Sequence, residues 1–97
     1  MGLTVNIYYT GENGSAVEFA EEMTNSGIVR EVRNEPGNLK YEYYLPLSGG
    51  ETVLLIDRWE NETALDAHHK SDIMPRIAAL RKKYRLKMKV ERFIDEG

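Results

Sequence analysis

Residues 52–59, with the sequence TVLLIDRW, contain four consecutive apolar residues, Val53 to Ile56, over a length that suits one β-strand. Successive side chains of a strand point to opposite faces, so Val53 and Leu55 share one face. Leu54 and Ile56 share the other face. A strand that is apolar on both sides must be covered on both sides. Any fold for this chain therefore has to bury two faces of the sheet that contains residues 52–59.

Three more segments alternate with the period of a strand. They are residues 3–9, 38–45 and 86–90. The apolar face of residues 3–9 consists of Leu3, Val5 and Ile7. The corresponding face of residues 38–45 consists of Leu39, Tyr41, Tyr43 and Leu45, and that of residues 86–90 consists of Leu86, Met88 and Val90. The turn residues Ser48-Gly49-Gly50 separate residues 38–45 from residues 52–59, which predicts a hairpin between these two strands.

Helical spacing of apolar residues fills the gap between the first two strands. A stripe at Ala16, Phe19, Ala20 and Met23 breaks at residues 24–27 and then resumes in a shifted phase. This predicts two abutting helices, or one helix kinked at Gly27. The expected cap of the first helix is Asn13 or Ser15.

The gap after residues 52–59 also has helical character. Asn61 or Thr63 is expected to begin a helix that carries the two histidines of the chain. A further helix is expected over about residues 71–84, with Pro75 in its first turn, where the missing N–H costs little.

The resulting order of strand, helix, strand, strand, helix and strand predicts an α+β fold of the ferredoxin-like type. In this fold a four-stranded antiparallel sheet carries its helices on one face. The second face of residues 52–59 would then lack cover. A second copy of the chain, packed sheet against sheet, is the simplest cover, and we predict an obligate homodimer through the sheet face.

Composition excludes several classes of protein. The chain has 97 residues, no cysteine and a net charge of −3, and no apolar run approaches the length of a membrane span. A thiolate metal site is excluded, and the adjacent histidines lack the spacing of a metal motif. We expect one cytoplasmic domain that binds neither metal, membrane nor nucleic acid.

The basic run at residues 81–89, RKKYRLKMK, leaves two interpretations open. It could be a phosphate-binding stripe, or a helix end followed by the solvated face of a strand. The acidic net charge and the single aromatic residue in the run, Tyr84, favour the second interpretation.

Three motifs resemble the antibiotic biosynthesis monooxygenase domain. They are EPGNLKYEY at residues 35–43, LIDRWENE at residues 55–62 and ALDAHHKS at residues 64–71. They follow the order and spacing of that family, and the resemblance covers nearly the whole chain as a single domain over residues 1–97. It implies a dimeric α+β barrel that oxygenates quinols or polycyclic phenols with O2 and without a cofactor. Relatives in the superfamily isomerise sugar-derived signals or degrade haem.

The quinol-oxygenase relatives match these motifs best, because they keep a Trp and a His at the positions of Trp59 and His68. The haem-degrading relatives share Asn6 but have a catalytic Trp where this chain has His68. They also have a haem-binding His at the position of Ala78. The signal isomerases share His68 but carry another His at the position of Ile73.

His68 is the candidate general base. An oxygenase without flavin or metal has to obtain electrons for O2 from its substrate, and a deprotonated phenol is electron-rich enough to supply them. The protein must then provide a base, hold the anion and exclude water. A neutral imidazole suits the first task near pH 7. The alternative is a buried histidine bonded to a backbone carbonyl. His69, about 100° further round the helix, is expected to face solvent or the dimer seam, and is the second histidine that could line a substrate pocket.

Four other residues are candidates for the site. Trp59 could wall an aromatic pocket and donate its indole N–H, or could simply pack in the core. Tyr41 and Tyr43 could bind the substrate, or could belong to the dimer interface. Asn6 could donate a hydrogen bond to a developing oxyanion, or could be a surface amide.

Asp57 and Arg58 are charges inside an otherwise apolar strand. As neighbours they point to opposite faces, and each is expected to find a partner across the dimer or under a helix. Arg58 could instead hold an anionic substrate.

Three functions stay open at this level. The first is a cofactor-independent monooxygenase that acts on a small aromatic substrate with molecular oxygen. The second is an isomerase that uses His68 without oxygen, and the third is a non-catalytic dimer that binds a small ligand.

Overall fold

A computed structural model describes residues 2–95 of the chain. Its strands are β1 (Leu3–Thr10), β2 (Asn38–Tyr44), β3 (Thr52–Trp59) and β4 (Lys87–Ile94). Its helices are α1 (Ser15–Asn25), α2 (Ile28–Arg33), α3 (Glu62–His69) and α4 (Ile73–Lys83). The strands form one antiparallel sheet in the order β2-β3-β1-β4. The predicted ferredoxin-like α+β fold is confirmed.

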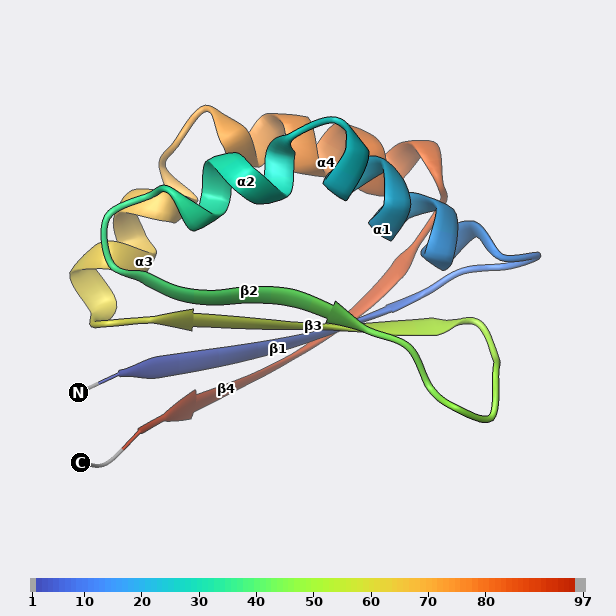
Figure 1. The fold of residues 1–97 in the computed structure, drawn as a ribbon, viewed down its shortest axis with the longest axis horizontal. Helices are drawn as coiled ribbons and strands as arrows, with labels where there is room; N and C mark the ends of the chain where they lie inside the picture. The colour runs from blue at the N-terminus through green and yellow to red at the C-terminus, as the bar shows by residue number, and fades with distance from the viewer. Residues whose placement is uncertain (1, 96–97) are drawn as a thin grey trace.

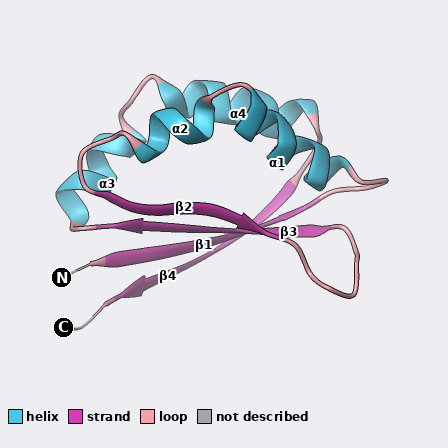
Figure 2. Cartoon of the chain, in the orientation of Figure 1, coloured by secondary structure: helices cyan, strands magenta, loops and turns pink. Residues whose placement is uncertain are grey.

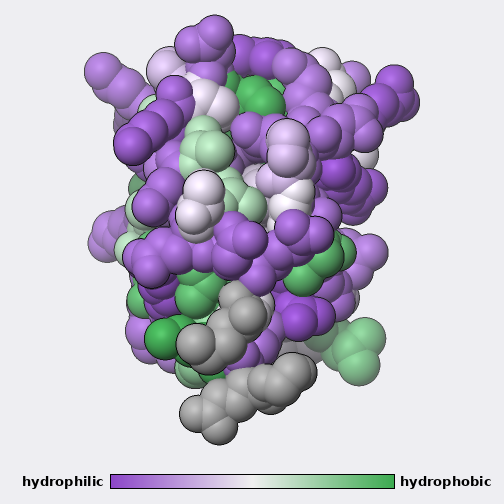
Figure 3. All heavy atoms as spheres, turned by 90° about the vertical axis from the view of Figure 1, so that its left-hand side faces the viewer, coloured by the Kyte–Doolittle hydropathy of each residue, from purple (hydrophilic) through white to green (hydrophobic). Residues whose placement is uncertain are grey.

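All four helices lie on the same side of this sheet, and the two chain ends lie at one end of it (Figure 1). Figure 2 shows that no helix of the described residues covers the opposite face, which we call the open face. No helix in the described part of the chain is long and apolar enough to cross a membrane. Figure 3 views the end that carries α3, where hydrophilic side chains dominate and most hydrophobic ones lie in the lower half of the view.

The chain breaks between α1 and α2 where expected, as two abutting helices. Gly27 adopts φ +89°, a left-handed conformation that favours glycine and stops the helical path. The predicted cap of α1 is wrong, because Gly14 precedes the helix and no side chain caps it. Ser15 instead accepts a hydrogen bond from the N–H of Glu12 at 2.9 Å.

The histidine-bearing helix begins as expected. The Oδ1 atom of Asn61 accepts a hydrogen bond from the N–H of Ala64 at 2.9 Å, so Asn61 and not Thr63 is the cap of α3. Pro75 is the third residue of α4 and lies in its first turn. The basic run covers the end of α4 and the start of β4, as in the second interpretation above.

Burial alternates along β3. Val53, Leu55, Asp57 and Trp59 are buried on the helix side. Leu54 and Ile56 point to the open face, where they are half-buried within the single chain. The strand that is apolar on both faces is therefore covered by helices on one face only.

The alternation predicted for residues 38–45 is wrong at both ends. The pairing of β2 with β3 is irregular between Asn38 and Lys40, and Leu39 is exposed. Leu45 lies beyond the end of β2 and is also exposed. Tyr41 and Tyr43 stay on the helix side, where Tyr41 is buried. A β-bulge shifts the side chains on one side of it by one position, and this explains the loss of Leu39 from the apolar face.

Candidate functional site

One row of residues crosses the helix side of the sheet in register, from β2 to β4. It consists of Tyr41, Asp57, Val5 and Arg92. Because neighbouring strands lie about 4.8 Å apart, the backbones of Asp57 and Arg92 are separated by roughly 10 Å across the row. Two residues further along β3, Trp59 shares the face of Asp57.

A cavity of about 300 Å³ lies over this row, between the sheet and helices α3 and α4. Most of its wall is apolar and comes from Val5, Ile7, Leu55, Leu65, Met74, Ile77, Met88 and Val90. Its polar lining consists of Tyr9, Tyr41, Asp57, His68, His69, Arg81 and Arg92. An apolar cavity with a few polar groups is the usual form of a site for a small ligand.

His68 lies in the last turn of α3 and is only 4% exposed. Its Nδ1 atom lies 2.6 Å from Oε1 of Glu35, a residue of the loop before β2. Its ring stacks on the indole of Trp59, with ring centroids 4.7 Å apart and planes 29° from parallel. The partner of Nδ1 is thus a carboxylate and not a backbone carbonyl.

This contact determines which nitrogen of His68 can act as a base. A carboxylate only accepts hydrogen bonds, so Nδ1 carries the proton that it donates to Glu35. In the neutral ring Nε2 is then the unprotonated nitrogen. The carboxylate also stabilises the imidazolium that forms when Nε2 takes a proton.

The loop that carries Glu35 is held tightly against α3. Gly37 has φ +83°, and a Cβ atom at this position would lie 2.5 Å from the Cβ of Ala64. The N–H of Glu60 donates a hydrogen bond to the carbonyl of Gly37 at 2.8 Å. Only glycine fits this close approach, which brings Glu35 within reach of His68.

A second hollow, of about 450 Å³, also reaches His68. It is lined by the loop of residues 35–37 and by residues at the start of α3. His68 therefore belongs to the walls of both hollows.

Asp57 is buried on the helix side and is 4% exposed. Its Oδ1 atom has no hydrogen-bond partner among the described residues of the single chain, and a partner across the dimer stays a prediction. Burial raises the pKa of Asp57 to about 7, and the negative charge of Glu35 adds to this rise while the nearby indole N–H of Trp59 opposes it. Asp57 therefore changes its charge near neutral pH.

Aromatic residues surround these groups. Trp59 is fully buried, and neither its Nε1 atom nor the hydroxyl of Tyr43 has a hydrogen-bond partner among the residues described. Burial raises the pKa of Tyr9 to about 12 and holds the pKa values of Tyr41 and Tyr43 well above the ordinary value. The tyrosines are neutral at physiological pH and can donate hydrogen bonds, but they are poor bases.

The structure does not bring every candidate residue to this cavity. Asn6 and Arg58 lie on the open face, on the other side of the sheet from His68. Arg58 donates to Oδ2 of Asp95 at 2.7 Å, which is the structural ion pair considered above, formed within one chain. His69 lines the cavity, and its ring centroid is 5.7 Å from that of His68. Partial burial and the charge of His68 lower the pKa of His69.

Sequence reasoning did not assign roles to Glu35 and Asp57. The charge of Asp57 inside an apolar strand was the available signal, because a buried charge without an obvious partner marks a site worth inspection. No comparable signal identified Glu35, which lies 33 residues before its partner in the chain.

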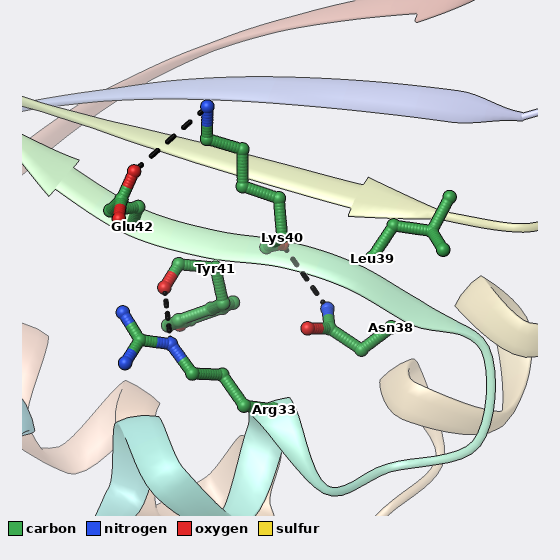
Figure 4. A pocket seen from close by; sticks show the side chains of 6 residues that line it. All are labelled: Arg33, Asn38, Leu39, Lys40, Tyr41 and Glu42. Atoms are coloured by element: carbon green, nitrogen blue, oxygen red, sulfur yellow. Dashed lines mark hydrogen bonds and ion pairs between the residues drawn. The ribbon is translucent and has the colours of Figure 1, made fainter.

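Another hollow runs along the edge of β2 (Figure 4). The Nε atom of Arg33 donates to the carbonyl of Tyr41 at 3.0 Å, and the side-chain amide of Asn38 donates to the carbonyl of Lys40 at 3.2 Å. Since these polar groups satisfy one another, this edge is a weaker candidate for a ligand site. Within residues 2–95, no group of three His, Cys, Asp or Glu side chains could hold a metal ion.

Together, the fold and the cavity define a class: a small ferredoxin-like α+β protein in which a buried histidine, paired with a carboxylate, lines a largely apolar cavity. Residues 2–80 match the family described as "Antibiotic biosynthesis monooxygenase", and the chain belongs to this family.

Solved structures share the fold at low sequence identity. A conserved protein from Methanosarcina mazei Go1 is 22% identical with a TM-score of 0.82, over 99% of this chain and 94% of that one. The protein PA3566 from Pseudomonas aeruginosa is 21% identical with a TM-score of 0.79, over 99% and 95%. SnoaB, a cofactor-independent oxygenase from Streptomyces nogalater, is 11% identical with a TM-score of 0.80, over 99% and 94%. No curated protein matches the chain.

Proposed function

We propose that this protein is a cofactor-independent monooxygenase that oxidises a quinol or polycyclic phenol with O2. The observation that carries the proposal is that His68, which is hydrogen-bonded to Glu35, lines an apolar cavity of about 300 Å³. Membership of the antibiotic biosynthesis monooxygenase family supports it. The shared fold of SnoaB, which is a cofactor-independent oxygenase, agrees with it.

The first step is removal of the phenolic proton. Nε2 of His68 takes the proton, and Glu35 stabilises the resulting imidazolium through its contact with Nδ1. The apolar part of the wall disfavours water near the substrate, which helps the phenolate keep its electron density for O2. Trp59 presents a large aromatic surface behind His68.

The substrate then reduces oxygen. The phenolate transfers one electron to O2, and the phenoxyl radical and superoxide combine to form a carbon–oxygen bond. The terminal oxygen of the peroxide takes a proton back from His68, which gives a hydroperoxide. The hydrogen on the peroxide-bearing carbon is then lost as a proton, its electron pair forms the carbonyl as the O–O bond breaks, and the released hydroxide takes up that proton and leaves as water. One oxygen atom enters the product and the other enters water, and the substrate supplies all four electrons. No external reductant is needed.

The proposed active form is a homodimer through the open face. Leu54 and Ile56 are half-buried there, and Phe93 on β4 is 49% exposed in the single chain. A partner sheet would cover these residues and stabilise the pair by the burial of apolar surface. Asn6 and Arg58 would then lie at this interface and away from the substrate cavity of their own chain.

Oxygen uptake with reduced naphthoquinols and benzoquinols tests the function, in a buffer free of flavin and metal. We expect uptake well above autoxidation. His68→Ala should lower kcat about 10²–10⁴-fold. Glu35→Gln keeps a hydrogen-bond acceptor without the charge and should lower kcat about 10–100-fold. Arg76→Gln, which affects an exposed pair with Glu31, is the control and should leave uptake unchanged.

The result also separates the alternatives. Uptake that equals autoxidation for every quinol would refute the oxygenase. Turnover of a substrate that depends on His68 but consumes no O2 would indicate an isomerase. Saturable binding of aromatic ligands without turnover would indicate a binding protein.

A further inference from the structure

One unpaired polar atom lies in the wall of the cavity. Asp57 Oδ1, Trp59 Nε1 and the hydroxyl of Tyr43 are buried on the helix side of the sheet without a hydrogen-bond partner in the described part of the chain, and Asn6 Oδ1 is a fourth such atom on the open face. Of these residues, Asp57 is the one that lines the cavity. Buried polar atoms are nearly always paired in folded proteins, so an exception in a cavity wall points to a missing ligand.

Asp57 is the most unusual member of this group. It is 4% exposed, it lines the cavity, and its Oδ1 atom has no hydrogen-bond partner among the described residues, although the indole N–H of Trp59 lies near enough to the carboxyl group to oppose the rise of its pKa. Arg92, in the same row, forms its ion pair with Glu62 instead, and its guanidinium is 3.3 Å from the carboxylate of that residue. An unpaired carboxylate in an apolar wall is costly, whereas a neutral carboxyl group can remain there and donate one hydrogen bond.

The chemistry of Asp57 indicates what it would bind. A neutral carboxyl group has an O–H that donates a hydrogen bond. The partner of this donor is an acceptor, and on an aromatic ligand the fitting acceptor is a carbonyl or phenol oxygen. A donor at a conjugated carbonyl also stabilises the negative charge that spreads onto it when another ring oxygen is deprotonated.

We propose that Asp57 contacts the substrate directly and that its neutral carboxyl group donates a hydrogen bond to a ring carbonyl or phenol oxygen, in addition to the oxygen that His68 deprotonates. The residue thereby selects aromatic hydroxyketones and related rings that carry two oxygen functions. This inference rests on the proposed function in taking the cavity over β3 as the substrate site.

Other charged groups near Asp57 bear on any pH dependence. The tyrosines of β1 and β2 stay neutral over the relevant range, because burial raises their pKa values. The remaining groups that line the cavity or act on Asp57 are Glu35, His68, His69, Arg81 and Arg92. Arginine side chains keep their charge over this pH range, whereas carboxyl and imidazole groups can change theirs, so several groups can contribute to a pH profile. A variant that changes Asp57 alone is therefore required.

Ligand binding without turnover provides the test. We would measure the Kd of 1-tetralone by isothermal titration calorimetry, with tetralin, which lacks the carbonyl, as the matched probe. For the wild type, the Kd of 1-tetralone should rise at least about tenfold between about pH 5.5 and about pH 8.5, because ionised Asp57 can no longer donate. The Kd of tetralin should stay constant or fall less.

Two variants of one position make the test specific. Asp57→Asn is neutral and can donate at every pH, so it should bind 1-tetralone with little pH dependence. Asp57→Leu cannot donate, so it should bind 1-tetralone weakly at both pH values and still bind tetralin. Circular dichroism establishes that each variant is folded. Equal affinity of wild type and Asp57→Leu for 1-tetralone would overturn the inference, as would a pH dependence that Asp57→Asn retains in full.

Failure of this inference can be told apart from failure of the proposed function. Oxygen uptake that depends on His68, together with 1-tetralone binding that is independent of Asp57, would refute only the role of Asp57. Binding that depends on Asp57, without oxygen uptake, would refute only the oxygenase. Absence of 1-tetralone binding by the wild type at the lower pH would also refute the role of Asp57.

Discussion

The imidazole of His68 lies face to face with the indole of Trp59, with 4.7 Å between the ring centroids. Glu35 holds the same imidazole in its plane through Nδ1. A stacked surface and an in-plane hydrogen bond restrict different rotations, so together they fix the direction of Nε2. The ring is thus positioned before any ligand binds, which is what a general base needs.

The stack leads to a prediction about Trp59. Trp59→Phe keeps an aromatic face and should lower kcat less than tenfold. Trp59→Ala leaves a cavity in the core and should lower the free energy of unfolding by about 3–5 kcal/mol. Urea denaturation followed by circular dichroism measures this loss. If Trp59→Phe removed activity completely while Trp59→Ala unfolded like the wild type, the indole would have a chemical role and little packing role.

The carboxyl group of Asp57 predicts a pH dependence of stability. Its pKa rises from 3.8 to about 7 on folding, so the folded chain binds the proton more tightly than the unfolded chain. The contribution of Asp57 to stability is complete at low pH and is lost as pH rises to about 7, by up to roughly 4 kcal/mol. The difference in the free energy of unfolding between Asp57→Asn and the wild type should grow over this range and then level off. A difference that is constant with pH would show that Asp57 ionises normally.

A comparison of Gly27 and Gly37 distinguishes the stability cost of backbone strain from that of steric overlap. Gly27 has φ +89° and open space where a Cβ would lie, so Gly27→Ala should cost about 1–2 kcal/mol from conformation alone. At Gly37 a Cβ would also overlap Ala64, so Gly37→Ala should cost roughly 2–5 kcal/mol. Thermal denaturation of both variants gives the comparison. An equal loss of stability in the two variants would mean that the loop of Gly37 moves away from α3 without a cost in free energy.

The open face predicts a dependence of the oligomeric state on Ile56. Ile56→Glu places a charge in the centre of the proposed interface and should convert the dimer to a monomer. Ala79→Glu, on an exposed position of α4, is the control and should leave the dimer intact. Light scattering after gel filtration reports both masses. A wild-type monomer, or an Ile56→Glu dimer, would contradict the proposed interface.

Local patterns predicted most of the fold. The succession of strands and helices along the chain, the helix break at Gly27 and the cap at Asn61 follow from side-chain period and turn chemistry, which depend on neighbouring residues. The exposure of Leu39 could not be predicted, because the irregularity beside it is a property of strand pairing.

The site was predicted in part, for a similar reason. His68, Trp59 and Tyr41 were selected by residue type, and the structure places them together. The link from His68 to Glu35 joins distant parts of the chain and leaves no local pattern. Asp57 departs from the rule that buried charges are paired, and such departures concentrate at functional sites.

His68 belongs to the walls of two hollows, and Glu35 lines only the one formed by its own loop. In the proposed reaction the substrate occupies the cavity over the sheet, while Glu35, 17% exposed, faces the second hollow. A proton that the ring accepts in the cavity over the sheet can thus exchange with bulk solvent through the second hollow. The reaction with oxygen takes place in the cavity over the sheet. In the proposed reaction the side chain of His68 separates the two hollows and transfers protons, but not water molecules, between them.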